Sequence, residues 1–244
     1  MKYELFYWPG LQGRGEFVRL AFEEAGVPYV DIALVPGEGG GADAIMRVLD
    51  DPKLARPPFA PPWLRVGKQL ISQTANILLY LGPRLGLAPR DAAGRTWAHQ
   101  LQLTIADFVD EAHDTHHPVG SSLYYEEQKR EARRATHFFL KDRVPKFLGY
   151  FEHVIERNRG RGPWMIGSSI TYVDLSMAQV VAGLRYAFPK AMRGEMRKYP
   201  RLARLHRAVL ARPRIRKYVK SGRQVPFNTT GIFRHYPELD RPVR

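Results

Sequence analysis

The chain of 244 residues contains no cysteine. Disulfide bonds, a catalytic cysteine and a thiolate metal site are therefore excluded. If this protein performs sulfur chemistry, the sulfur atom has to arrive with a substrate.

Long hydrophobic runs are also missing, although 44% of the residues are hydrophobic and 25% are charged. No stretch of about 18 or more apolar residues occurs, so no membrane span is predicted. The opening residues, MKYELFYWPG, carry an acidic residue at position 4 and have no long apolar core, which argues against a secretory signal. We therefore expect a cytoplasmic protein whose length allows a sizeable core.

Acidic residues are scarce, because 24 Asp and Glu face 38 Lys and Arg and leave a formal net charge of +14. Much of the excess lies between 189 and 223, where thirteen Lys or Arg are opposed only by Glu195. Such a stretch could bind phosphates, or it could be a solvated helix surface whose arginine stems cover apolar side chains. No recognisable nucleic-acid motif accompanies it, so a nucleic acid partner is not expected.

The first 82 residues alternate strand and helix patterns. Gly26 and the glycine-rich PGEGGGAD segment mark the breaks between these patterns. Strands are expected over 2–8, over 28–35 and in a hairpin within 59–71, and helices over 14–25, 43–50 and 72–81. This order of elements predicts a small α/β domain spanning 1–82.

Strand patterns end near Gly82-Pro83, and 83–90 is predicted to be a linker. An all-helical domain is expected over 91–221, with proline and glycine at its breaks. Its helical patterns run roughly over 92–116, 126–157, 172–186 and 193–220. The final segment, 222–244, has no periodicity and is predicted to be an ordered or draped extension.

Four stretches of this sequence occur in an order that is typical of one known family. They are YWPGLQGRGEFVRLAFEEAGVPY, PPWLRVGKQLISQTANILLYLGPRLGL, WMIGSSITYVDLSMAQV and LARPRIRKYVKS. Together they resemble the cytosolic glutathione S-transferases of the tyrosine-type classes alpha, mu, pi and sigma, over roughly residues 3 to 221. The resemblance implies an α/β thioredoxin-like N-terminal domain followed by an all-α domain. It also implies a homodimer that uses glutathione and a hydrophobic electrophile, with no cofactor beyond glutathione as co-substrate.

Tyr7 follows the first predicted strand and precedes a helix start. A free thiol has a pKa of about 8.5, and lowering it by two units takes about 2.7 kcal/mol of selective thiolate stabilisation. One charge-assisted hydrogen bond supplies about 1.5–3 kcal/mol, and a tyrosine hydroxyl is a suitable donor. The resemblance gives Tyr7 this catalytic role, whereas the residues alone also allow ordinary strand packing.

The roles of three residues near Tyr7 each allow two interpretations. Arg14 opens the first helix, and the resemblance places it beside the bound substrate, although it could be a surface arginine. Trp8 and Leu11 could line the substrate sites or belong to the core. Trp8 is predicted to be a substrate-binding residue, and Leu11 is a candidate for the hydrophobic pocket of the electrophile.

Gln73 and Thr74 begin a helix after the predicted hairpin. Thr74 is a suitable N-cap, and a helix start can hold a carboxylate. By resemblance the pair binds the γ-glutamyl end of glutathione. Asp107 is implied to reach across the dimer to the same end, with Asp110 as the competing choice and a solvated carboxylate as the plain alternative.

Pro62 matches the cis-proline of the family, whose preceding residue pairs with the backbone of glutathione. Here that residue is Pro61, which has no N–H, so one of two backbone hydrogen bonds should be missing. Ala60 belongs to the same predicted binding segment. Lys53 is the candidate for the glycyl carboxylate, with Arg56 as the alternative.

Three histidines gather before Pro118: His113, His116 and His117. Their spacing invites a metal site, but no cysteine or fourth ligand supports it, so no metal is predicted. His113, His117 and Tyr124 are instead expected to line the electrophile pocket, with Tyr125 as an alternative to Tyr124.

Two further features concern structure and assembly. Thr171 and Asp174 have the spacing of a capping box and are predicted to be structural. Phe59 could insert into a partner subunit. The competing function is a non-catalytic binding or scaffold protein of the same fold, which would use the basic stretch at 189–223 for acidic partners.

Overall fold

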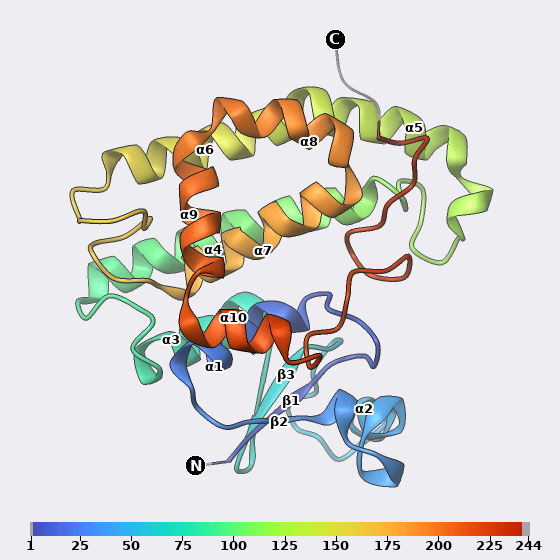
Figure 1. The fold of residues 1–244 in the computed structure, drawn as a ribbon. Helices are drawn as coiled ribbons and strands as arrows, with labels where there is room; N and C mark the ends of the chain where they lie inside the picture. Colours follow the sequence, from blue (N-terminus) through green and yellow to red (C-terminus); the bar gives the residue numbers. More distant parts are fainter. Residues whose placement is uncertain (1, 241–244) are drawn as a thin grey trace.

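A four-stranded sheet forms the base of the molecule, a computed structural model that describes residues 2–240 (Figure 1). Its order is β2-β1-β3-β4, in which β1 pairs in parallel with β2 and antiparallel with β3. The strands are β1 (Tyr3–Phe6), β2 (Val30–Asp31), β3 (Trp63–Val66) and β4 (Gln69–Ser72). Tyr3 of β1 lies opposite Val66 of β3, and Phe6 lies opposite Trp63.

Helices cover both faces of this sheet because side chains alternate along each strand. Tyr3 and Leu5 of β1 pack with α1 (Gly15–Ala25) and α3 (Thr74–Arg84). Phe6 of β1 points to the other face, where α2 (Gly41–Leu49) packs. Tyr7 follows β1 directly, so it leaves the sheet beside the start of α1.

The helical half of the chain stacks on α1 and α3 (Figure 1). Its central helix, α7, is buried along almost its whole length and packs against α1, α4 and α9. No helix among residues 2–240 is long and apolar enough to cross a membrane. The helices are α4 (Ala92–Asp114), α5 (Lys129–Phe138), α6 (Val144–Arg157), α7 (Tyr172–Ala187), α8 (Pro189–Glu195), α9 (Pro200–Leu210) and α10 (Pro213–Lys220).

Short irregular helices join some of these elements. Five residues of π-helix, Phe139–Arg143, connect α5 to α6, so the helix expected over 126–157 is nearly continuous from Lys129. The 3-10 turns are Ile32–Leu34, Gly37–Gly39, Tyr125–Glu127 and Met196–Lys198.

Three predicted boundaries are wrong. The strand expected over 28–35 has only two residues, because the carboxylate of Asp31 accepts from the N–H of Ala33 and turns the chain into a 3-10 helix. The helical pattern expected over 193–220 is broken at Pro200, where the proline predicted a break, and also at Pro213, where none was predicted; proline cannot donate to the preceding turn. Residues 83 and 84, expected in the linker, form the last turn of α3.

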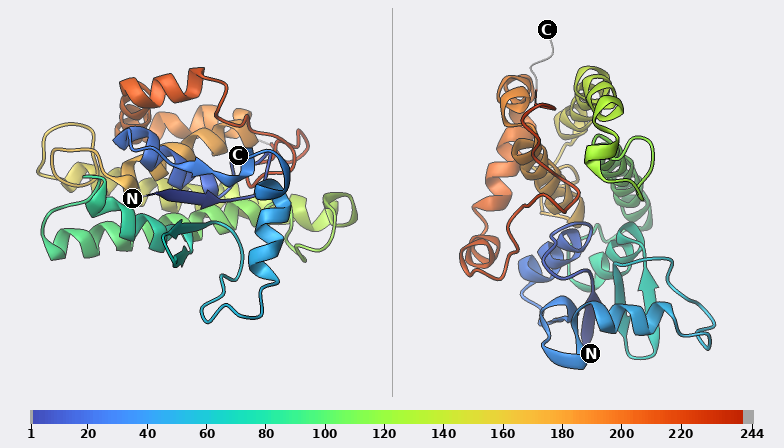
Figure 2. Two further views of the ribbon diagram at one scale, coloured as in Figure 1. Left: turned by 90° about the horizontal axis from the view of Figure 1, so that it is seen from below. Right: turned by 90° about the vertical axis from the view of Figure 1, so that its right-hand side faces the viewer.

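Beyond α10 the chain contains no helix or strand as far as residue 240 (Figures 1 and 2). This C-terminal extension passes the loop after β1 and then follows the helical half. Phe233 packs so closely on Gly183 of α7 that a Cβ at Gly183 would collide with its ring. The carboxylate of Asp240 accepts from the N–H groups of Lys190 and Ala191 at 2.9 and 3.0 Å, at the start of α8.

Candidate active site

Tyr7 is held between two glycines of the loop between β1 and α1. Its side chain is 5% exposed. A Cβ at Gly13 would collide with the Tyr7 hydroxyl, and a Cβ at Gly15 would collide with its ring. The GRG sequence is therefore needed to place the phenol against the start of α1.

The Tyr7 hydroxyl accepts a hydrogen bond from the backbone N–H of Arg14 at 2.9 Å. Within residues 2–240, no group accepts the proton of this hydroxyl. Burial raises the pKa of Tyr7 above its usual value, while the Arg14 N–H and the charges of Arg14 and Arg19 act in the opposite direction. At neutral pH the side chain is thus a neutral phenol with one free donor.

Arg14 connects three elements around Tyr7. Its guanidinium forms an ion pair with Asp110 of α4. Its carbonyl accepts from the hydroxyl of Thr74 at 3.4 Å, at the start of α3. The structure therefore brings Asp110, rather than Asp107, to Arg14 within the protomer, whereas Asp107 is exposed on α4.

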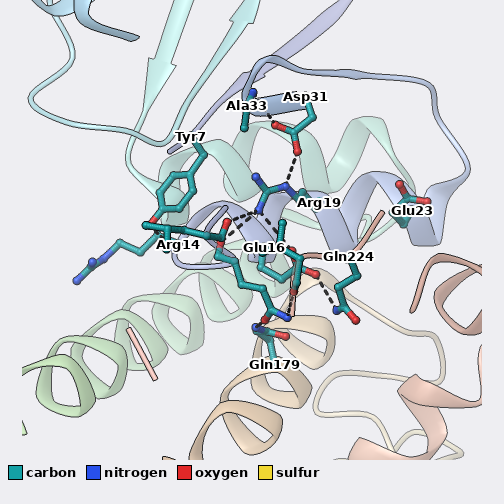
Figure 3. Close-up of polar contacts among 12 residues, drawn as sticks. Tyr7, Arg14, Glu16, Arg19, Glu23, Asp31, Ala33, Gln179 and Gln224 are labelled. Atoms are coloured by element: carbon teal, nitrogen blue, oxygen red, sulfur yellow. Dashed lines mark hydrogen bonds and ion pairs between the residues drawn. The ribbon is translucent and has the colours of Figure 1, made fainter. Parts of the chain in front are cut away.

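Arg19 holds the loop between β1 and α1 in place, a role that was not predicted from the sequence (Figure 3). It is 2% exposed and pairs with Asp31 at 2.6 Å and with Glu16 at 3.4 Å. Its Nη1 also donates to the carbonyls of Leu11 and Gln12 at 3.1 and 3.2 Å. The Arg19 guanidinium therefore fixes the loop that carries the Tyr7 site. Nothing in the sequence signalled this role, because a Glu and an Arg three residues apart resemble an ordinary surface pair.

The same loop is tied to the helical half through amide side chains. Nε2 of Gln179, on α7, donates to Oε1 of Gln12 at 2.6 Å. Nε2 of Gln12 donates to the carbonyl of Val225 at 2.5 Å, and Gln224 donates to Glu16 at 2.9 Å. The extension thus contributes to holding the loop, which its lack of periodicity could not reveal.

The peptide bond between Pro61 and Pro62 is cis, as the resemblance predicts. Both prolines are buried at the start of β3, while Ala60 is exposed. Because Pro61 has no N–H, only its carbonyl can pair with an extended ligand backbone on this segment.

Gln73 has φ of +70°, the only positive φ of a non-glycine residue among those the structure describes. Such strain in an exposed residue is typical of functional sites. Gln73 is itself the N-cap of α3 and makes no side-chain capping bond. The prediction that Thr74 is the cap is wrong, because Thr74 is the first helical residue and its hydroxyl turns to Arg14. The first N–H groups of α3 are left for a ligand or water.

The remaining predicted substrate-binding residues include Trp8 and Lys53, with Arg56 as the alternative to Lys53. Trp8 is half-buried and packs on the cluster between the sheet and α2. Lys53 and Arg56 are exposed in the loop before Ala60. Their positions leave either cation free to meet an anion at that edge of the sheet.

The candidates for the electrophile pocket differ in how far they are buried. His113 and His117 lie at the end of α4, and Leu11 is half-buried in the loop. Tyr124 is 77% exposed, whereas the neighbouring Tyr125, its predicted alternative, is buried. Between Gln12–Gly13 and residues 226–233 of the extension, the remaining cavity is about 10 Å³, enough for about one water molecule.

No group of three or more potential metal ligands occurs within residues 2–240. Thr171 and Asp174 form a capping box at the start of α7. Oδ2 of Asp174 accepts from the N–H and the hydroxyl of Thr171 at 2.7 and 2.9 Å, and its Oδ1 accepts from Met165 at 2.8 Å. Burial raises the pKa of Asp174 to about 6.

Part of the basic stretch at 189–223 is neutralised by acids from elsewhere in the fold. Arg201 pairs with Glu152 and Glu156, and Arg212 pairs with Glu24. Arg223 pairs with Glu23. The stretch is therefore partly a structural surface that joins α9 and α10 to α1 and α6.

Comparison with known proteins agrees with this arrangement. A family model described as "Glutathione S-transferase, C-terminal domain" matches residues 113–222. A glutathione S-transferase of Plasmodium falciparum is 20% identical over 225 residues, covering 90% of this chain and 96% of its own length. Glutathione S-transferase P 1 of Xenopus laevis is 25% identical, covering 90% and 92%. The solved Pi-class glutathione S-transferase of Onchocerca volvulus superposes with a TM-score of 0.71 at 20% identity, covering 95% of this chain and 99% of that one.

Proposed function

The chain belongs to the glutathione S-transferase family by its fold, its C-terminal domain and its curated relatives, and from this premise we propose that Tyr7 activates glutathione for conjugation. In this reaction the glutathione thiolate attacks an electrophilic carbon of a second substrate. The Tyr7 hydroxyl donates a hydrogen bond to the sulfur and stabilises its anionic form. The reaction needs no cofactor beyond glutathione.

The observation that carries the proposal is the geometry of the Tyr7 hydroxyl. It accepts from the Arg14 N–H at 2.9 Å, so its own proton points to a position where no residue of the described chain accepts it. A buried, neutral phenol with a free proton is a fixed donor for an anion. The N-terminus of α1 lies beside it and favours negative charge further.

The rest of glutathione would lie across the edge of the α/β domain. The first N–H groups of α3, with the strained Gln73, suit the γ-glutamyl carboxylate. The carbonyl of Pro61 suits the cysteinyl N–H. Lys53 is proposed as the partner of the glycyl carboxylate, since it is exposed in the loop that leads to this edge.

The test is the substitution Tyr7→Phe, which removes the hydroxyl and little else. We expect kcat/KM for conjugation to fall by about 10- to 150-fold, the loss of one hydrogen bond to a charged group of about 1.5–3 kcal/mol. The pKa of bound glutathione, followed by thiolate absorbance, should rise toward about 8.5.

Tyr3→Phe is the matched control, because Tyr3 is a buried tyrosine of β1, four residues before Tyr7, and it packs on Phe22. It should leave turnover within about twofold. Equal turnover of Tyr7→Phe and the unchanged protein would remove the catalytic role.

We also propose that the protein works as a homodimer. Phe59 is 91% exposed, and Asp107 is exposed on α4. A lone phenylalanine so exposed suits insertion into a partner subunit. Sedimentation of Phe59→Ser should show monomers where the unchanged protein shows dimers, and a monomeric unchanged protein would end this part of the proposal.

A further inference from the structure

The C-terminal extension brings an arginine to the three histidines at the end of α4. The ring centroids of His113, His116 and His117 lie 4.8–5.1 Å from one another. The positive charge of Arg234 lowers the pKa of all three histidine rings. We call these four residues the histidine–arginine cluster.

Arg234 is fixed by the turn that precedes it. Its Nε donates to the carbonyl of Gly231 at 2.8 Å, and its Nη2 donates to the carbonyl of Thr230 at 3.2 Å. Oδ1 of Asn228 accepts from the N–H groups of Thr230 and Gly231, both at 3.0 Å. Nδ2 of Asn228 donates to the carbonyl of Gly10, which ties the turn to the loop beside Tyr7. Within the described chain, Nη1 of Arg234 keeps both of its protons free.

Each histidine also has one ring nitrogen within hydrogen-bond distance of another group. Nε2 of His116 lies 2.8 Å from the carbonyl of Ile232, and this ring is buried. Nδ1 of His113 lies 3.2 Å from Asp114, and Nδ1 of His117 lies 3.2 Å from Nε2 of Gln128. Nε2 of His113 has no hydrogen-bond partner within residues 2–240, whereas the ring of His117 also meets the backbone of Leu123. Both rings are half-buried, so they are accessible to a small molecule.

The cluster disfavours further positive charge. Burial is the main cause of the lowered pKa of each ring, and the Arg234 charge lowers all three further. The Arg14 charge also lowers the pKa of His113. The opposing carboxylates nearby are Asp114, which is exposed and bonded to His113, and Asp110, which is paired with Arg14. A site with fixed N–H donors, at which additional positive charge is unfavourable, is suited to bind an anion.

Arg14 and α4 connect the cluster to Tyr7. Arg14 contacts the Tyr7 hydroxyl through its N–H and Asp110 through its side chain. His113 is three residues beyond Asp110, about 4.5 Å further along the helix axis. A substrate attacked by a sulfur at Tyr7 can therefore extend along α4 to His113, His117 and Arg234.

We propose that the histidine–arginine cluster binds a carboxylate of the second substrate, so that the protein conjugates glutathione to electrophiles that carry an anionic group. This inference rests on the proposed function and names its substrate class. It differs from the hydrophobic electrophile that the family resemblance implies. The extension is part of the substrate site, because it supplies Arg234.

The test compares 4-chloro-3-nitrobenzoate with its uncharged analogue, 4-chloro-3-nitrobenzamide. In both, the thiolate forms a bond to the ring carbon that bears chlorine, and the carbon–chlorine bond breaks with release of chloride. We expect the unchanged protein to have a higher kcat/KM for the benzoate, relative to the uncatalysed rates. Arg234→Gln and His117→Gln should lower the benzoate-to-benzamide ratio of kcat/KM by about tenfold, a change of about 1.4 kcal/mol.

Arg223→Gln is the control, because this arginine lies just after α10 and is paired with Glu23. It should leave the ratio unchanged, and Arg234→Lys, which keeps the charge, should retain most of it. A ratio equal in the unchanged protein and Arg234→Gln would overturn the proposal, as would a preference for the benzamide.

Binding of the two reaction products separates this proposal from the proposed function. Calorimetry should show tighter binding of the benzoate–glutathione conjugate than of the benzamide conjugate, with the difference lost in Arg234→Gln. This result needs no turnover, so it stands even if Tyr7→Phe proves fully active. Equal binding of both conjugates by the unchanged protein would overturn the cluster's role while leaving the Tyr7 proposal intact.

Discussion

Gln12 and Gln179 join their side chains across the two halves of the molecule, with Nε2 of Gln179 donating to Oε1 of Gln12 at 2.6 Å. Both residues are almost fully buried. The bond fixes a loop of the α/β half by a helix of the helical half. The position of Tyr7 therefore depends on a residue far away in the sequence.

The first prediction concerns this bond. Gln179→Ala leaves a buried amide of Gln12 without its partner, which should lower the free energy of unfolding by about 1–3 kcal/mol. Catalytic efficiency should fall as well, since the loop loses an anchor. Gln100→Ala, at an exposed site on α4, should stay within about 0.5 kcal/mol. Equal unfolding midpoints of the two variants would contradict the expectation.

The second prediction concerns Gly13. Its φ is +44°, and an added Cβ would meet the Tyr7 hydroxyl. Gly13→Ala should therefore lower kcat/KM at least tenfold and cost about 1–2 kcal/mol of stability from backbone strain alone. Gly39→Ala is the matched control, because open space surrounds that position. An active, stable Gly13→Ala protein would show that the phenol has room to move.

The third prediction concerns Asp174, whose pKa burial raises to about 6. A carboxyl group with a higher pKa in the folded than in the unfolded chain favours folding most at low pH, and this contribution is lost as pH rises from about 4 to 6. Denaturant unfolding should therefore show that Asp174→Asn is more damaging at pH 4 than at pH 7, by up to about 3 kcal/mol. A difference that does not vary with pH would argue against a buried, shifted carboxyl group.

The fourth prediction concerns His206, which is buried on α9. Burial, followed by the charges of Arg185 and Arg207, lowers its pKa to about 4. A histidine with a lowered folded pKa supports stability fully above about 6.5, and this support is lost as pH falls toward 4. His206→Leu should therefore lose less stability than the unchanged protein between pH 7 and pH 4.5. Parallel pH profiles of the two proteins would rule out this contribution.

The order of strands and helices could be predicted because hydrophobic period, proline and glycine are local signals. The same signals failed where a side chain redirected the backbone. Asp31 ends β2 because its carboxylate accepts a hydrogen bond from the N–H of Ala33. Whether an aspartate makes this bond depends on the local backbone conformation, which the residue type alone does not determine.

The site was predictable only in its local parts. Tyr7, Arg14 and the cis bond before Pro62 belong to short motifs, and the structure places Tyr7 and Arg14 in contact. The role of Arg19, on α1, was not predicted because its partner Asp31 comes from β2, twelve residues further along the chain. The role of Arg234 was not predicted either, because its turn and the histidines are far apart in the sequence and come together only in the folded chain.

The extension is clamped at both ends. Gln224 bonds Glu16 at one end, and Asp240 bonds the first N–H groups of α8 at the other. The segment between them crosses the molecule as a strip without helix or strand. Contacts along this strip also reach the loop that carries Tyr7, since Nδ2 of Asn228 donates to the carbonyl of Gly10 at 2.8 Å. A substitution within 226–238 is therefore expected to alter the surroundings of the phenol together with the segment that it changes.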